Sequence, residues 1–320
     1  MIRAILLRLS NSAGVKKLLN TWPIARRVAR RFIAGETLVD AVRVVRELNA
    51  QGFFATLDPL GENTTREQDA RHSTDEILET IEAVQRERLR SGVSIKLSQI
   101  GLLLDEQLCF DNLKRLLAAA NQSGIFIRID MEDSGLVDRT LDIHRKARSE
   151  PGWQYLGLVI QAYLYRSQAD LKRLAGGGTP IRLVKGAYQE SEQVAYPRKA
   201  DVDANFDRLT DILVETALQA DGRPVDGTGR IPPLAAIASH DDERANYAIL
   251  SAEKAGLRKD CLEFQMLYGI RRDLQMRLRD LGYPVRIYVP FGREWYPYFM
   301  RRLAERPANL WFFLSNLVRR

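Results

Sequence analysis

Residues 156–188 decide the fold of this chain and read L-G-L-V-I-Q-A-Y-L-Y-R-S-Q-A-D-L-K-R-L-A-G-G-G-T-P-I-R-L-V-K-G-A-Y. Two short apolar runs of β type, 156–161 and 181–184, lie on either side of a segment whose apolar residues have helical spacing. The glycine run 176–178 precedes the second strand, whereas a nucleotide-binding glycine loop follows a strand, so it is interpreted as a turn. Two strands separated by a helix predict a parallel pair with a crossover connection.

The same alternation continues in both directions along the chain. Apolar runs of β type recur eight times, at 53–57, 93–97, 125–129, 156–161, 181–184, 234–239, 262–266 and 285–289. Eight such units match a (β/α)₈ barrel, which typically needs roughly 250 residues. A doubly wound sheet is the main alternative, but no strand is followed by G-x-G-x-x-G, and neither a P-loop nor a G-x-S-x-G elbow occurs. We therefore predict an α/β fold, a (β/α)₈ TIM-like barrel over residues 49–320, preceded by a basic helical arm over residues 1–48.

The composition is that of a globular chain with a large core. Of 320 residues, 45% are hydrophobic and 28% charged, and no apolar run reaches the eighteen or so residues of a membrane-spanning helix. Cys109 and Cys261 cannot form a disulfide framework, which favours a reducing compartment. The three histidines are far apart and no H-E-x-x-H or C-x-x-C motif occurs, so we expect no metal site.

The positive charge is concentrated at the start of the chain. Residues 1–35 hold eight basic residues and no acidic one, so the remaining 40 basic and 41 acidic residues leave the rest at −1. Residues 2–10 and 24–33 have the pattern of basic amphipathic helices, which either pack on the main domain or attach to an anionic membrane surface. A neutral body argues against nucleic acid as a partner. We expect a cytoplasmic protein at the inner face of the cell membrane; the arginine-rich start leaves the mitochondrial matrix open.

Polar residues cluster where the predicted strands end, which is where barrel enzymes place their active sites. Lysine and arginine inside a strand are costly unless paired, so these residues predict a cationic mouth that binds an anion: a carboxylate, a phosphate or a reduced flavin. They are Asp58, Glu62, Lys96, Asp130, Glu132, Gln161, Arg182, Lys185, Tyr188, Ser239, His240, Gln265, Arg286 and Tyr288.

A second group of polar residues lies on the last predicted helix. Tyr298, Arg301, Arg302 and Glu305 fall at i, i+3, i+4 and i+7, which is one face of a helix. A guanidinium is well shaped to bind a carboxylate through two hydrogen bonds. Arginine pairs also occur at Arg26–Arg27 and Arg271–Arg272, so the pair alone would equally fit a solvated helix face.

Eight sequence strings resemble the proline dehydrogenase family in the family's order. They are L-D-P-L-G-E (57–62), S-I-K-L-S (94–98), I-R-I-D-M-E-D (127–133), V-I-Q-A-Y (159–163), I-R-L-V-K-G-A-Y (181–188), E-F-Q-M-L-Y-G (263–269), R-I-Y-V-P-F-G (286–292) and Y-F-M-R-R-L-A-E (298–305). The resemblance implies a monofunctional bacterial-type, FAD-dependent (β/α)₈ enzyme. Such an enzyme oxidises L-proline to 1-pyrroline-5-carboxylate by hydride transfer to flavin N5 and passes the electrons to membrane quinone.

The resemblance also implies a substrate site. Arg301, Arg302 and Lys96 would bind the proline carboxylate, and Asp130 would lie beside the pocket. The proline ring would be held by Tyr188, Leu267, Tyr288 and Tyr298. Glu62 would pair with the first helix arginine as a gate over the ligand. A bulky residue at Tyr288 disfavours 4-hydroxyproline in the family, so proline is the expected substrate.

The cofactor site follows from the same resemblance. Arg182 would lie near the reacting edge of the flavin, so that Lys96, Asp130 and Arg182 form the catalytic group. The remaining cofactor residues would be Glu132, Gln161, Lys185, Gly186, Ala187, Ser239 and His240. Relatives have T-H-N after strand six, where this chain has Ser239, His240 and Asp241. The spacing from Tyr288 to Arg301 is also slightly shorter than in the family.

Two other classes of function remain as alternatives. A non-flavin barrel enzyme that acts on a small carboxylate or phosphorylated substrate would also need a cationic mouth, but would be colourless. A flavin-free binding or regulatory module would bind proline analogues without redox activity. The sequence does not predict an oligomeric state.

Overall fold

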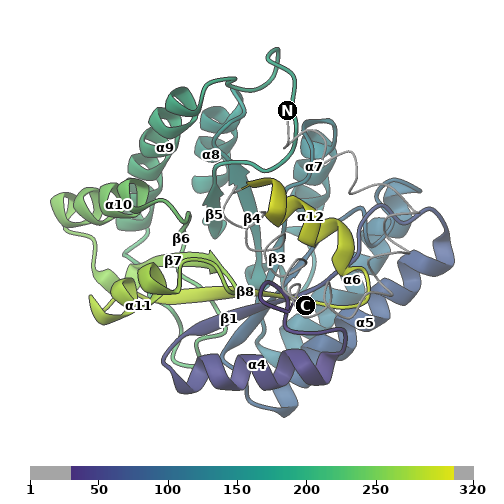
Figure 1. Cartoon of the computed structure of the whole chain (residues 1–320). Coiled ribbons are helices and arrows are strands. Elements are labelled where there is room, and N and C mark those ends of the chain that lie inside the picture. Colours follow the sequence, from purple (N-terminus) through teal and green to yellow (C-terminus); the bar gives the residue numbers. More distant parts are fainter. Residues whose placement is uncertain (1–29, 306–320) are drawn as a thin grey trace, which may run out of the picture.

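A computed structural model describes residues 30–305, with the backbone alone for residues 301–305. Eight parallel strands close into a barrel in sequence order, which confirms the predicted fold (Figure 1). The strands are β1 Phe54–Pro59, β2 Ser91–Ile95, β3 Ile127–Ile129, β4 Leu156–Gln161, β5 Ile181–Val184, β6 Ala235–Ala238, β7 Leu262–Leu267 and β8 Val285–Phe291. The barrel closes where β8 pairs with β1, with Phe54 opposite Arg286.

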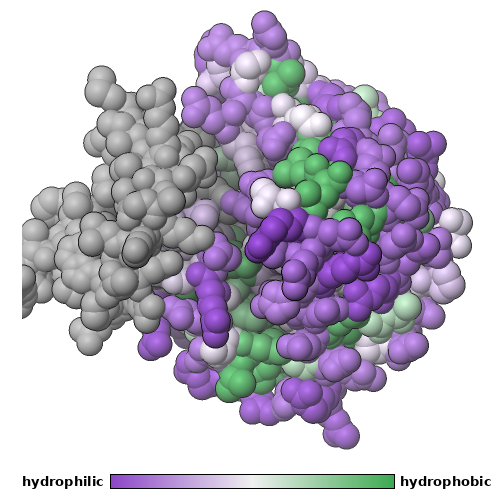
Figure 2. Space-filling view, turned by 90° about the vertical axis from the view of Figure 1, so that its right-hand side faces the viewer, coloured by the Kyte–Doolittle hydropathy of each residue, from purple (hydrophilic) through white to green (hydrophobic). Residues whose placement is uncertain are grey.

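A helix follows every strand. These helices are α5 Glu67–Arg86, α6 Glu106–Ser123, α7 Val137–Ala147, α8 Ser167–Ala175, α9 Lys199–Gln219, α10 Asp242–Ala255, α11 Arg272–Asp280 and α12 Trp295–Glu305. Their apolar residues face the strands: in α5 the buried residues include Ile77, Ile81 and Val84, spaced by four and three as an amphipathic helix requires. The outer surface on the side of α5 and α6 is mostly hydrophilic (Figure 2). Three short 3₁₀ turns are Ser134–Leu136, Trp153–Tyr155 and Lys259–Cys261.

Helix α4, Leu38–Ala50, precedes the first strand and packs on the barrel. Thr37 and Asp40 form a capping box at its start, and its buried face belongs to the main core. The predicted boundary between arm and barrel, at residue 48, falls inside this helix. Residues 2–10 and 24–29 of the predicted amphipathic segments lie outside the described residues, whereas residues 30–33 form a turn whose Phe32 and Ile33 are buried.

The interior of the barrel corrects one expectation from the sequence. Arg286 was expected at the mouth, but its guanidinium donates to the carbonyls of Ala55 (2.8 Å) and Gly229 (3.2 Å), and to the carboxylate of Glu263 (2.8 Å). Ala55 is near the start of β1, and Gly229 is in the loop that enters β6. Arg286 therefore lies towards the amino-terminal end of the barrel, below the mouth.

Candidate active site

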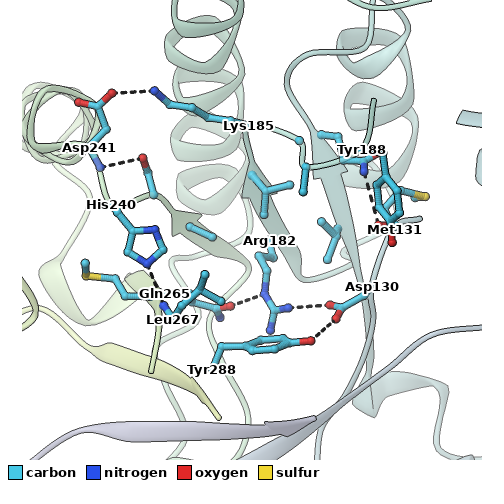
Figure 3. A pocket seen from close by; sticks show the side chains of 18 of the residues that line it. Asp130, Met131, Arg182, Lys185, Tyr188, His240, Asp241, Gln265, Leu267 and Tyr288 are labelled. Atoms are coloured by element: carbon cyan, nitrogen blue, oxygen red, sulfur yellow. Dashed lines mark hydrogen bonds and ion pairs between the residues drawn. The ribbon is translucent and has the colours of Figure 1, made fainter. Parts of the chain in front are cut away.

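A cavity of about 470 Å³ opens at the carboxyl ends of the strands, where a barrel enzyme places its active site. Most of the residues predicted for the site line it: Lys96, Asp130, Gln161, Arg182, Lys185, Gly186, Ala187, Tyr188, Ser239, His240, Leu267, Tyr288 and Tyr298. Figure 3 shows their side chains converging from several strands and from the loop after β5. Tyr298 comes from α12, so this helix covers part of the cavity, and Figure 1 shows it crossing near the barrel axis.

Arg182 is the best-anchored cation of the cavity. Its Nη1 donates to Asp130 Oδ1 at 2.7 Å and its Nε to the carboxamide oxygen of Gln265 at 2.5 Å (Figure 3), and its Nη2 donates to Ser94 at 3.2 Å. The hydroxyl of Tyr288 donates to the other oxygen of Asp130 at 2.7 Å, and the guanidinium lies 5.3 Å from the centre of the Tyr288 ring. The guanidinium is thus held in one orientation before any ligand binds.

Lys96 supplies a second positive charge. Its Nζ lies 3.2 Å from Asp58 Oδ1 and 4.0 Å from Asp130 Oδ2. Burial lowers the pKa of Lys96, but the charges of Asp58 and Asp130 outweigh that effect and hold the pKa above its usual value. The side chain therefore stays an ammonium at the cavity wall, where it can attract an anionic ligand.

The loop after β5 is held by an ion-pair cluster. Lys185 Nζ lies 2.5 Å from Asp203 Oδ1 on α9 and 2.7 Å from Asp241 Oδ2, and Lys199 bonds the other oxygen of Asp203. Burial raises the pKa of Asp241, but the hydrogen bond and charge of Lys185, the backbone N–H of Glu243 and the charge of Lys199 together outweigh it, and the pKa lies below its usual value. Both carboxylates are therefore charged, and the loop is fixed between α9 and the start of α10.

Gly186 brings backbone close to an aromatic ring in this loop. Its φ of +115° is left-handed, and an added Cβ would lie 2.4 Å from the Tyr163 ring. A side chain here would force the loop away from β4 or into the cavity. Glycine therefore lets the backbone of this loop pack against Tyr163 while it lines the cavity between Lys185 and Ala187.

Two side chains present defined hydrogen-bonding groups to the cavity. The backbone N–H of Leu267 donates to Nε2 of His240 at 2.9 Å, so the neutral imidazole carries its proton on Nδ1. The Nε2 of Gln161 donates to the carbonyl of Glu132 at 3.1 Å. Its Oε1 is buried and has no hydrogen-bond partner within the described part of the chain, so it can accept a bond from a ligand.

Two predicted site residues, Glu132 and Glu62, do not line the cavity, and the side chains of two more lie outside those described. The carboxylate of Glu132 instead accepts bonds from the backbone N–H and hydroxyl of Ser98, and burial raises its pKa despite them. Glu62 lies in the loop after β1, where its charge helps to raise the pKa of Lys96. Arg301 and Arg302 are on α12, but their side chains lie outside those described.

The cavity also contains residues that were not assigned to the site from the sequence. They are Met131, Val159, Val184, Lys199, Ala238, Asp241 and Met266. The alternation of a strand gives a signal for some of them: Val159 precedes Gln161 by two residues, and Val184 follows Arg182 by two, so each pair faces the same side. Lys199 and Asp203, four apart on α9, were detectable as a helical ion pair.

A family model described as proline dehydrogenase matches residues 41–314 of this chain. The chain belongs to the proline dehydrogenase family. It is 37% identical over 318 residues to proline dehydrogenase 2 of Bacillus subtilis, covering 99% of both chains. It is 40% identical over 295 residues to the proline dehydrogenase of Deinococcus radiodurans, covering 91% of this chain and 90% of that one.

Solved structures of the same family agree with the fold. Proline utilization A of Bdellovibrio bacteriovorus, inactivated by N-propargylglycine, superposes with a TM-score of 0.78 at 28% identity, over 88% of this chain and 33% of that longer chain. With the family established, the chain is an oxidoreductase that acts on proline in proline catabolism. Within residues 30–305, no helix is both long and apolar enough to cross a membrane.

Proposed function

We propose that the chain binds FAD and oxidises L-proline to 1-pyrroline-5-carboxylate. The observation that carries this proposal is one cavity that combines two anchored cations, Lys96 and Arg182, with a glycine-containing loop at Gly186. The cations suit a carboxylate and a cofactor that gains negative charge. The backbone of the loop at Gly186 lines the same cavity as the two cations. Membership of the proline dehydrogenase family favours this reaction over that of a non-flavin barrel enzyme.

The residues of the cavity fit a flavin by their chemistry. The unpartnered Oε1 of Gln161 is an acceptor for a ring N–H, and Arg182 donates to regions of negative charge. Lys185, Ala187, Ser239, His240 and Gly186 would hold the remainder of the cofactor. When bound, FAD would accept the hydride from the proline ring carbon next to nitrogen.

Proline itself would be oriented through its carboxylate. Lys96, Arg301 and Arg302 would bind the two oxygens, and Glu62 would close over the ligand by pairing with Arg301. The ring would pack against Leu267, Tyr288, Tyr298 and Tyr188, of which Tyr288 is fixed by Asp130. Holding the reacting carbon in one place lowers the barrier by removing the cost of orientation.

The ammonium of free proline must lose a proton, and the described side chains of the cavity favour solvent as its acceptor. Lys96 stays protonated, because the charges of Asp58 and Asp130 hold its pKa above its usual value against the effect of burial. Burial, and next the charge of Asp130, raise the pKa of Tyr288 well above its usual value, so its hydroxyl stays neutral. Asp130 accepts bonds from Arg182 and Tyr288. We therefore assign no general base.

The first test is an absorbance spectrum of the purified protein before and after anaerobic addition of L-proline. We expect a flavin spectrum that bleaches with L-proline but not with D-proline. A flavin that stays oxidised would mean that proline is not the substrate. A protein that remains colourless after reconstitution with FAD would contradict the proposal and favour the non-flavin alternative.

We propose further that membrane quinone reoxidises the enzyme and that residues 1–35 attach it to an anionic bilayer. Eight basic residues can each contribute about 1 kcal/mol of attraction to such a surface. A chain lacking residues 2–29, which keeps the buried Phe32 and Ile33, should lose cosedimentation with vesicles that contain phosphatidylglycerol and keep its activity with a soluble acceptor. Neutral phosphatidylcholine vesicles are the control. Cosedimentation that survives the deletion would contradict the role of this arm.

A further inference from the structure

Four buried polar side chains form a continuous row inside the barrel, which leads from below the cavity up to its wall. They are Arg286 on β8, Glu263 and Gln265 on β7, and Arg182 on β5, and each is at most 5% exposed. The row begins near the amino-terminal end of the barrel and ends at the cavity. Such a row is stable only if every member is hydrogen-bonded, because unpaired buried polar groups are costly.

The lower end of the row is fixed to the backbone. Arg286 donates to the carbonyls of Ala55 and Gly229, which belong to β1 and to the loop before β6. The same guanidinium binds Glu263 through two hydrogen bonds, Nε to Oε1 at 2.8 Å and Nη2 to Oε2 at 3.0 Å. Glu263 is fully buried and therefore has one position.

Glu263 in turn determines how Gln265 is oriented. The Nε2 of Gln265 donates to Glu263 Oε1 at 2.5 Å, and its Oε1 accepts from Arg182 Nε at 2.5 Å (Figure 3). A carboxylate can only accept and a guanidinium can only donate. The carboxamide therefore has a single satisfactory orientation, with its oxygen towards Arg182.

Gln265 provides one of three contacts that hold the Arg182 guanidinium. Asp130 binds Nη1, Ser94 binds Nη2 and Gln265 binds Nε, so each nitrogen has its own partner. Without Gln265 the Nε of Arg182 loses its acceptor, and the guanidinium can rotate about its contact with Asp130. A shift of about 1 Å at such a group can cost roughly a hundred-fold in rate.

We propose that Glu263 and Gln265 are positioning residues that hold Arg182 in the orientation needed for cofactor reduction. This inference rests on the proposed function, in which Arg182 stabilises the negative charge that the flavin gains. Glu263 does not line the cavity, and Gln265, which does, has both ends of its carboxamide bonded, to Glu263 and to Arg182. Glu263 acts through Gln265, and Gln265 acts through Arg182.

The test compares Gln265→Met, Glu263→Gln and the double variant with the unsubstituted protein, all loaded with FAD. We expect Gln265→Met to shift the flavin midpoint potential to a more negative value. We also expect kcat to fall about ten- to hundred-fold with little change in KM for proline, since the lost interaction forms only as the flavin gains charge. Glu263→Gln should shift the potential in the same direction. Removal of a negative charge would by itself raise it, so a merely electrostatic role predicts the opposite sign.

The double variant tests whether the two residues act in series. The contact of Glu263 with Gln265 is the route by which it positions Arg182, so we expect the double variant to have a potential no more negative than that of Gln265→Met alone, whereas independent positioning effects would add. Gln265→Asn, whose carboxamide is too short to reach both neighbours, takes the place of Gln265→Met if the latter does not fold. Asn112→Leu removes a buried carboxamide on α6 that donates to the carbonyl of Ile100 in the turn before this helix, and it should leave the potential and kcat unchanged.

Two results would overturn the positioning role: a folded Gln265 variant with unchanged potential and kcat, or additive effects in the double variant. The proposed function is judged separately, by whether proline bleaches the flavin of the unsubstituted protein. If FAD binds but proline does not reduce it, that function fails, and the potentials still decide whether the row holds Arg182.

Discussion

Lys96→Met is expected to abolish measurable binding of proline and to destabilise the folded protein. The Lys96 ammonium is the cation between Asp58 and Asp130, at 3.2 Å and 4.0 Å, and its side chain is 9% exposed. Its removal leaves two carboxylates close together in a buried site, with one oxygen of Asp58 already lacking a hydrogen-bond partner within the described residues. Breaking a buried ion pair costs about 3–5 kcal/mol of stability. A proline carboxylate would also meet negative charge where it now meets an ammonium.

The measurements are the midpoint of urea unfolding and the dissociation constant for proline. Adding Asp58→Asn to Lys96→Met removes one stranded carboxylate, so the pair should recover stability without recovering proline binding. Lys114→Met is the matched surface control. Lys114 pairs with Asp111 at 2.8 Å but is 39% exposed, so its replacement should leave the midpoint of unfolding nearly unchanged. If Lys96→Met binds proline as tightly as the unsubstituted protein does, Lys96 is not part of the substrate site.

The sequence predicted the existence of all eight strands, but not where each begins and ends. The run 125–129 is apolar at every position except Arg128, yet Ile125 still bonds back to Ala120 at the end of α6, so β3 starts at Ile127. β8 continues through Pro290 to Phe291, because Asp58 and Pro59 of β1 pair alongside these residues. Strand ends depend on which neighbour is present, and a single run of residues does not contain that information.

The depth of a side chain along the barrel axis could not be predicted from the sequence either. Arg286 and Tyr288 are two apart and both face the interior, as the alternation of a strand requires. Tyr288 reaches the cavity and Arg286 binds Glu263 below it, since register and strand tilt set the depth of each side chain. Gln265 stood at a predicted strand end, but its position between Glu263 and Arg182 depends on the pairing of strands far apart in the chain.

Arg302→Met is expected to raise the KM for proline by roughly 30- to 5,000-fold, the equivalent of about 2–5 kcal/mol for a broken buried charge pair. The reason is chemical, because a methionine of similar length retains the packing and cannot bind a carboxylate. The backbone places residue 302 on α12, one turn beyond Tyr298, whose side chain lines the cavity. The second arginine of the pair is therefore on the helix that covers the substrate site.

Steady-state kinetics with proline measure the effect, and inhibition by pyrrolidine, which has the ring without the carboxylate, separates its cause. If Arg302 binds the carboxylate, the variant should lose affinity for proline while pyrrolidine inhibits it as it inhibits the unsubstituted enzyme. Arg272→Met is the control from another arginine pair, because Arg272 is exposed and donates to Gln51 away from the cavity. Equal losses for proline and pyrrolidine would mean that Arg302 supports the fold of α12 instead. An unchanged KM for proline would exclude it from the site.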